Sequence, residues 1–183
     1  MLKAGYLGKS GERFIPHQTN PNEAIINVAR YFYAMNHLKD KIVCEVGCGC
    51  GLGTYLYSLV AKKIYAVDYS EEAIEYAKQY PLKDNVEFIE QNLEKYTNLP
   101  EHEVLVAIEF LEHLEDPLSF LKAQKSRELV FSLPRHSLAV SSWHKFDIES
   151  EADVKTLMAE AGYRITNMEL QENLWFYGHA IKL

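Results

Sequence analysis

KIVCEVGCGCGLGT, residues 41–54, is the stretch of sequence that decides the fold. Residues 42–46 form an apolar, largely β-branched run, which is typical of a buried parallel strand. Glycines then alternate with other residues through 47–53, and apolar residues from position 52 onward recur at helical spacing. The order strand, glycine-rich turn, helix is the context that a nucleotide-binding turn requires. Bare backbone at the glycines lets a ligand approach, and free N–H groups begin the helix.

Two details of this stretch indicate the kind of nucleotide. The spacing 47-GCGCGLG-53 does not fit the G-x-G-x-x-G dinucleotide fingerprint well, because Leu52 follows the third glycine. Glu45 lies just before the turn, where its carboxylate would repel a diphosphate and attract an ammonium group. A structural glycine-rich turn without a ligand is the alternative interpretation.

Strand and helix patterns alternate over almost the whole chain, which predicts a doubly wound α/β sheet. The expected strands are 42–46, 64–68, 86–89, 104–108, 128–133, 163–170 and 174–183. The expected helices are 22–38, one after the glycine turn, one starting at Ser70, 116–123 and 150–161. We expect a Rossmann-like, mostly parallel seven-stranded sheet with antiparallel pairing near the C-terminus. Residues 21–183 form a single domain in this interpretation, and residues 1–20 form an N-terminal lid or arm.

Length and composition narrow the class of protein. The 183 residues suit one domain, and 48% hydrophobic and 25% charged residues are ordinary for a globular chain. The formal net charge of −7 makes nucleic acid an unlikely partner. The N-terminal sequence lacks an apolar signal core, no apolar run is long enough for a membrane span, and the three cysteines do not form a disulfide pattern. These features predict a cytoplasmic protein with no membrane partner.

Polar residues follow the expected strands, where a doubly wound sheet binds its ligand. Asp68 ends the second strand, at the position of a carboxylate that accepts both ribose hydroxyls. Asn92 follows the third strand and is suited to reading adenine, although a turn asparagine is the alternative. Glu109 and Phe110 follow the fourth strand and face the remaining part of the ligand.

Two segments resemble a known family. Residues 45–51 have the pattern E-x-G-x-G-x-G, which resembles motif I of the class I S-adenosylmethionine-dependent methyltransferases. Residues 109–117, EFLEHLEDP, resemble the post-motif II stretch of methyltransferases related to the ubiquinone-biosynthesis O-methyltransferases. With Asp68 and the LPR after the fifth strand, the resemblance covers roughly residues 20–170. Glu45 stands where Asp is commoner, and Asn92 stands where Asp is frequent.

The resemblance implies S-adenosylmethionine as cofactor and S-adenosylhomocysteine as product. The residues it assigns to cofactor binding are Glu45, Gly47, Cys48, Gly49, Gly51, Asp68, Tyr69, Asn92, Leu93, Glu109 and Phe110. The sulfonium methyl group is already activated, so the protein has mainly to align an acceptor. For a hydroxyl acceptor a histidine base is suited, and His113 and His144 are the candidates. The alternative for His113 is a helix or loop histidine hydrogen-bonded to a backbone carbonyl. Glu112 is expected to be solvent-facing or structural, and His17, Tyr6, Arg13 and Trp143 are lesser candidates near the site.

Three alternatives to this function are a different methyltransferase target, a non-catalytic module and a metal site. A nucleic-acid amino-methyltransferase would carry an Asn/Asp-Pro-Pro-aromatic tetrapeptide where this chain has Glu109–Glu112, and a protein substrate is a further possibility. A non-catalytic cofactor-binding module is left open by the uncertain base. A metal site of Cys44, Cys48, Cys50 and a histidine lacks the C-x-x-C spacing of zinc sites, so no metal site is predicted. The prediction is a methyltransferase acting on a small molecule, through a hydroxyl, as a monomer or homodimer.

Overall fold

The computed structural model describes residues 14–15, 21–95, 97–135 and 142–183. The predicted N-terminal arm, residues 1–20, lies outside this part of the chain apart from Phe14 and Ile15. Tyr6, Arg13 and His17 therefore also lie outside the described residues. Ile15 is buried against Cys50 and Tyr76, so this residue contacts the glycine turn. No helix within the described ranges is long and apolar enough to cross a membrane.

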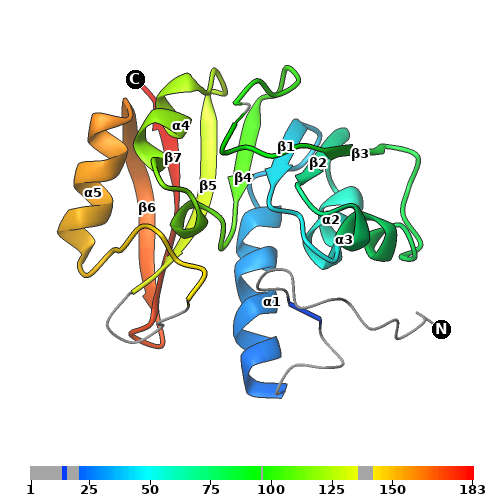
Figure 1. Ribbon diagram of the computed structural model, residues 1–183, viewed down its shortest axis with the longest axis horizontal. Helices are drawn as coiled ribbons and strands as arrows, with labels where there is room; N and C mark the ends of the chain where they lie inside the picture. The colour runs from blue at the N-terminus through cyan, green and yellow to red at the C-terminus, as the bar shows by residue number, and fades with distance from the viewer. Residues whose placement is uncertain (1–13, 16–20, 96, 136–141) are drawn as a thin grey trace.

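Helices and strands alternate as the sequence predicts (Figure 1). In chain order they are α1 (Pro21–Met35), β1 (Ile42–Val46), α2 (Leu52–Ser58), β2 (Lys63–Asp68), α3 (Glu71–Ala77), β3 (Val86–Glu90), β4 (Val104–Ala107), the 3-10 helix η1 (Leu111–His113), α4 (Pro117–Ala123), β5 (Glu128–Pro134), α5 (Glu151–Glu160), β6 (Tyr163–Gln171) and β7 (Trp175–Lys182). Side-chain caps fix three helix starts: Ser70, Asp116 and Ser150 each accept a backbone N–H bond from the first turn.

The strands form one seven-stranded sheet in the order β3-β2-β1-β4-β5-β7-β6. The pairs from β3 to β5 are parallel, whereas β7 pairs antiparallel with both β5 and β6. The predicted fold class is therefore confirmed. The chain order reverses between β1 and β4, so loops that leave these two strands diverge and open a crevice at their carboxyl ends.

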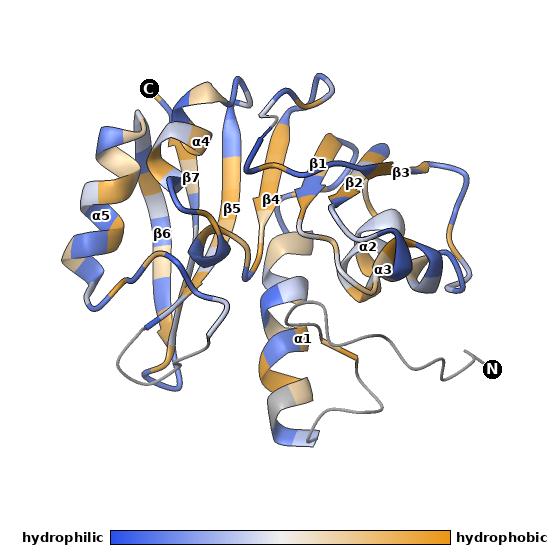
Figure 2. Ribbon diagram, in the orientation of Figure 1, coloured by the Kyte–Doolittle hydropathy of each residue, from blue (hydrophilic) through white to orange (hydrophobic). Residues whose placement is uncertain are grey.

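Helices pack on both faces of the sheet, and alternate residues of each strand point to opposite faces. Val43, Val104 and Val130 pack with residues of α1 and α2. Cys44, Leu105, Leu129, Phe131 and their neighbours pack with α4 and α5. Figure 2 shows the consequence, because β4 and β5 are hydrophobic along most of their length. A rigid central sheet buried on both sides holds the strand ends in fixed positions.

The first helix is shorter than the sequence suggests. Its apolar spacing continues to Leu38, but α1 ends at Met35. Leu38 still lies fully buried, because the chain turns there and Asp40 takes a left-handed conformation with φ of 59°. Apolar periodicity continues through this turn although the helical hydrogen bonds do not, which is why the pattern overestimated the helix.

Candidate functional site

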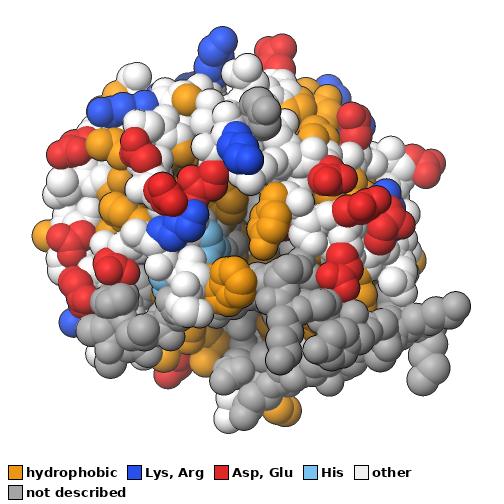
Figure 3. All heavy atoms as spheres, in the orientation of Figure 1, with side chains coloured by type: hydrophobic (Ala, Val, Ile, Leu, Met, Phe, Trp, Pro, Cys, Tyr) orange, Lys and Arg blue, Asp and Glu red, His pale blue; other side chains and the backbone are white. Residues whose placement is uncertain are grey.

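A pocket of about 320 Å³ lies at the carboxyl ends of β1, β2, β3 and β4. It is lined by Gly47, Gly49, Asp68, Tyr69, Gln91, Asn92, Leu93, Glu94, Glu109, Phe110, His113, Leu114, Trp143 and Lys145. Its volume lies within the range of small-molecule and cofactor sites. Figure 3 shows this face of the molecule, with a histidine side chain partly visible in the hollow beside basic and hydrophobic ones. Three carboxylates and one lysine line the pocket, so its charge favours a cationic ligand.

The glycine turn forms the floor beside β1 and α2. Gly47, Gly49 and Gly51 all have positive φ, between 50° and 81°, which side chains rarely adopt. A Cβ at Gly47 would lie 2.7 Å from the Phe110 ring, whereas a Cβ at Gly49 would meet no protein atom within 4 Å. The turn therefore packs tightly at Gly47 and leaves bare backbone facing the pocket at Gly49.

Asp68, the last residue of β2, is held rigidly at the pocket wall. Its Oδ2 accepts a hydrogen bond from the N–H of Gly49 at 2.8 Å, and its Oδ1 accepts one from the N–H of Ser70 at 2.9 Å. An ionised carboxylate has about four lone-pair sites, so each oxygen can accept one further bond. Only 8% of the residue is exposed, and it lines the pocket. Asp68 can thus accept two hydroxyl groups without moving.

Glu45 lies behind the glycine turn, outside the pocket lining. Its Oε2 accepts a hydrogen bond from Thr54 Oγ1 at 2.5 Å, and its Oε1 occupies the space that a Cβ at Gly53 would need. Burial raises the pKa of Glu45 to about 8, with nearby Asp68 adding to the rise. Near neutral pH the carboxyl therefore carries a proton, and an adjacent positive charge would favour its ionisation.

Asn92 and Leu93 follow β3 at the next strand end. Asn92 Oδ1 accepts a hydrogen bond from the N–H of Glu94 at 3.0 Å, which is the turn interaction that the alternative interpretation expects. Asn92 also lines the pocket beside buried Leu93 and exposed Tyr69. The structure thus places both an apolar surface and a side-chain amide at this end of the pocket.

Glu109 is positioned by residues from distant parts of the chain. It has φ of 50°, an unfavourable conformation for a residue with a Cβ. Ser132 on β5 stabilises this conformation of Glu109. The Ser132 Oγ accepts a hydrogen bond from the Glu109 N–H at 2.9 Å and donates one to Glu109 Oε1 at 2.7 Å. Buried Arg30 on α1 lies 3.7 Å from Glu109 Oε2 and stacks over Trp175. Glu109 is therefore held with its carboxylate at the pocket wall.

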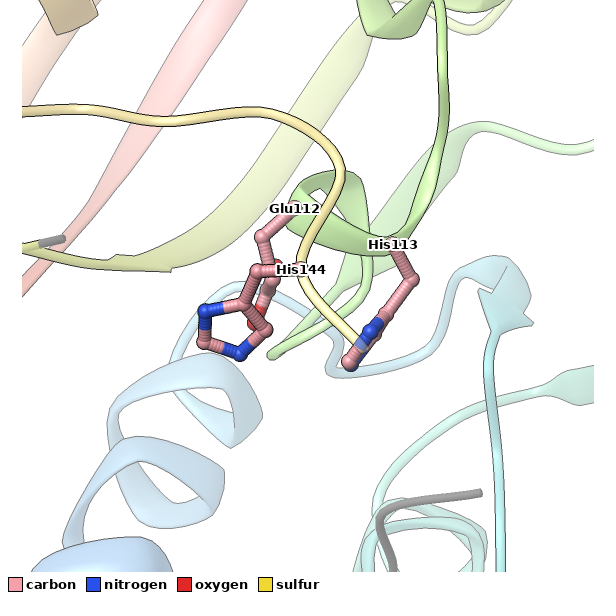
Figure 4. Close-up of side chains that lie close together, drawn as sticks. All are labelled: Glu112, His113 and His144. Atoms are coloured by element: carbon pink, nitrogen blue, oxygen red, sulfur yellow. The ribbon is translucent and has the colours of Figure 1, made fainter. Parts of the chain in front are cut away.

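His113 and His144 lie side by side, although they are far apart in the sequence. Their ring centroids lie 5.3 Å apart, and Glu112 lies beside them (Figure 4). His113 lines the pocket, and its Nδ1 lies 3.2 Å from the carbonyl oxygen of Trp143. Because a carbonyl only accepts, this bond places the proton on Nδ1 and leaves the Nε2 lone pair available.

The segment 143–146 is tied across this end of the pocket by its backbone. The N–H groups of Lys145 and Phe146 both donate to the Glu112 carbonyl oxygen, at 2.7 and 3.1 Å. Lys145 Nζ forms ion pairs with Glu94 at 2.9 Å and with Glu115 at 3.4 Å. These contacts fix Trp143 and His144 relative to η1.

The pocket brings together most of the residues that the sequence singled out. Glu45, Cys48 and Gly51 lie outside its lining, as does His144, whose ring contacts that of His113. Of the two expectations for Glu112, solvent-facing or structural, the first is wrong, because the residue is 1% exposed beneath the segment 143–146. Sequence reasoning missed Arg30 and Ser132, since an arginine in an amphipathic helix and a serine in a strand carry no motif.

Comparison with known proteins agrees with the sequence resemblance. Residues 44–125 match the methyltransferase domain family. The ubiquinone biosynthesis O-methyltransferase of Rickettsia bellii is 25% identical over 122 residues, which is 66% of this chain and 51% of that protein. The chain thus spans about half the length of the curated relatives that it matches.

Solved structures show the same fold. A S-adenosylmethionine-dependent methyltransferase from Aquifex aeolicus superposes with a TM-score of 0.70, at 21% identity, over 93% of this chain and 100% of that one. The N-methyltransferase NodS from Bradyrhizobium japonicum, solved with S-adenosylhomocysteine, gives a TM-score of 0.74 at 13% identity, over 94% and 93% of the two chains. The predicted resemblance in sequence and fold is confirmed.

Proposed function

We propose that this chain, which carries a class I S-adenosylmethionine-dependent methyltransferase domain, transfers the cofactor's methyl group to a small-molecule acceptor through a hydroxyl. The observation that carries the proposal is the pocket, which collects the glycine turn, Asp68, Asn92 and Glu109 from four neighbouring strand ends. No single element of the chain could supply this set. We assign this set to the cofactor, and His113, which also lines the pocket, to the acceptor.

The residues present fit S-adenosylmethionine. The cofactor is a cation at its sulfonium, and the pocket wall carries Asp68, Glu94 and Glu109 against one lysine. Asp68 is preset to accept the two ribose hydroxyls, and Asn92 with Leu93 would contact the adenine. Gly49 offers bare backbone where a ligand can approach closely.

Bound S-adenosylmethionine supplies a methyl group activated by its positive sulfur. The chain has then to hold an acceptor in line with that group and to exclude water, which is chiefly positioning work. Glu109, fixed by Ser132 and Arg30, supplies a stationary negative charge at the wall. Glu45 supports the glycine turn from behind, and we assign it to the cofactor's ammonium group. The positive charge of that group would favour ionisation of the Glu45 carboxyl.

The acceptor end of the pocket is assigned to His113 and His144, with Trp143 beside them. A neutral imidazole close to an acceptor hydroxyl is suited to take its proton. The pocket has a volume of about 320 Å³, and the segment 143–146 forms part of its lining. Such a pocket suits a small molecule better than a protein or a nucleic acid.

Turnover with a panel of small acceptors tests this proposal. Purified protein is incubated with S-adenosylmethionine and separate hydroxyl, amine and thiol compounds, and S-adenosylhomocysteine and methylated products are measured by mass spectrometry. We expect methylation of hydroxyl compounds and a loss of at least tenfold in turnover in Asp68→Ala, with Glu90→Ala, an exposed acid on β3, as the control. Product formation on amines alone would contradict the hydroxyl assignment. Cofactor binding without any turnover would favour a non-catalytic module.

A further inference from the structure

Beside the pocket, where His113 lines it, three side chains carry the donor atoms of a metal site. Glu112, His113 and His144 each offer a ligand atom, and these atoms all lie within 4.8 Å of one another. Figure 4 shows the three side chains gathered between η1 and the segment that carries His144. From these contacts we propose that the chain binds one divalent transition-metal ion, of the zinc type, at Glu112, His113 and His144.

The spacing of the three side chains suits such an ion. Zinc lies about 2.0–2.2 Å from imidazole nitrogens and carboxylate oxygens, so two of its ligands are at most about 4.4 Å apart. The ligand atoms lie within 4.8 Å of one another, and small side-chain rotations would bring them to the distances that the ion requires. Two imidazoles and one carboxylate favour zinc, cobalt or iron over magnesium, which prefers oxygen ligands alone.

The surroundings prepare His113 for coordination. The bond between its Nδ1 and the Trp143 carbonyl holds the ring in place and directs the Nε2 lone pair away from that carbonyl. A hydrogen bond from the non-ligating ring nitrogen to a carbonyl, like this one, is a usual support of a metal-bound histidine. The proton position and the ring orientation are thus both fixed before an ion binds.

Burial of Glu112 gives the second argument. Its carboxyl group lies 1% exposed beneath the segment 143–146, whose Lys145 and Phe146 N–H groups bind the Glu112 carbonyl oxygen. A divalent ion shared with two imidazoles would place a positive charge beside this buried carboxylate and stabilise its ionised form. The same backbone bonds that bury Glu112 also carry His144 into contact with His113.

Three protein ligands leave a coordination position open, as in catalytic rather than structural zinc sites. The role of this open position rests on the proposed function, whereas the metal site itself does not. His113 lines the pocket, so an acceptor hydroxyl can reach an ion at this place. The ion lowers the pKa of a hydroxyl that binds it, and the proton passes to solvent, so a histidine base is then not required.

Metal binding is tested without cofactor or acceptor. EDTA-treated full-length protein is titrated with Zn²⁺, Co²⁺ and Mg²⁺ by calorimetry, and the visible absorption of the Co²⁺ form is recorded. We expect one Zn²⁺ or Co²⁺ per chain, bound more tightly than Mg²⁺, and an absorption band of four- or five-coordinate Co²⁺. His144→Ala should weaken binding more than about tenfold, since loss of even a supporting residue costs 10- to 100-fold. His37→Ala, at the end of α1, is the control for binding to other histidines.

Two results would overturn the metal site: Zn²⁺ or Co²⁺ binding by wild-type protein at well below one ion per chain, or equal affinity in wild type and a folded His144→Ala variant. The wild-type stoichiometry and Co²⁺ spectrum decide the matter even if the variant does not fold. Methyl transfer that continues in EDTA without bound metal would reject the ion's role in activating the acceptor and keep the proposed function. Tight metal binding with no methyl transfer to any acceptor would keep the metal site and reject the proposed function.

Discussion

Replacing Glu45 by glutamine should remove a large part of the pH dependence of stability. Burial raises the pKa of Glu45 from 4.5 to about 8 in the folded protein. The folded state therefore holds a proton that the unfolded chain releases above pH 4.5. The stability from this proton is fully present below pH 4.5 and is lost as the pH rises through 8. Glutamine keeps the shape and still accepts the bond from Thr54, but it does not titrate.

The size of the effect follows from the two pKa values. Their difference of about 3.5 corresponds to about 5 kcal/mol, at about 1.4 kcal/mol for each pKa unit. Between pH 5 and 8 the free energy of unfolding of the wild type should fall by up to about 1.4 kcal/mol per pH unit relative to Glu45→Gln. At pH 7 the accumulated difference is about 3 kcal/mol.

Urea unfolding of both proteins at intervals from pH 5 to 9, followed by circular dichroism, measures this difference. Other titrating groups are present in both proteins, so subtraction of the two profiles isolates Glu45. Glu90→Gln, an exposed carboxylate on β3, should follow the wild-type profile. Parallel profiles for wild type and Glu45→Gln would refute the reasoning, because the folded and unfolded pKa values of Glu45 would then be equal.

Other substitutions test the turn, the cap and the support of Glu109. Gly47→Ala should lower the free energy of unfolding by about 2–3 kcal/mol, because it adds a clash with Phe110 to the cost of positive φ. Gly162→Ala, at φ of 80°, places its Cβ 3.9 Å from Lys182 and should lower the free energy of unfolding by about 1 kcal/mol in the same urea assay. Ser150→Ala should cost about 1 kcal/mol by removing the cap of α5, measured by thermal unfolding, and an unchanged midpoint would contradict the capping role. Ser132→Ala should cost about 1–3 kcal/mol, because it leaves the Glu109 N–H without its acceptor, and calorimetry should show weaker S-adenosylhomocysteine binding than in wild type.

The fold was predictable because its signals are local. Apolar runs mark β1 and β4, glycines mark the turn after β1, and Ser70 marks the start of α3. The rule that ligands bind at strand ends then predicts Asp68 and Glu109 in one pocket from the sequence alone. The order of strands and helices follows from these local patterns and was predicted correctly, whereas the end of α1 was not.

Side-chain contacts between distant segments were beyond the sequence. His113 and His144 meet only because the backbone of residues 145 and 146 binds the carbonyl of Glu112. Arg30 reaches Glu109 from a helix whose pattern indicates only an apolar face. The burial of Glu112 follows from the same loop crossing, for which the sequence carries no periodic signal.

Calorimetric titration with S-adenosylmethionine and S-adenosylhomocysteine tests the central claim, that this pocket holds the cofactor. Wild-type protein, Asp68→Ala and the control Glu90→Ala are compared at one pH, with thermal unfolding of each to show that it is folded. We expect wild type and Glu90→Ala to bind both nucleotides with the same affinity, and Asp68→Ala to lose at least tenfold because the ribose hydroxyls lose their acceptor. Failure of the folded wild-type protein to bind either nucleotide, or equal binding by a folded Asp68→Ala variant, would contradict the account.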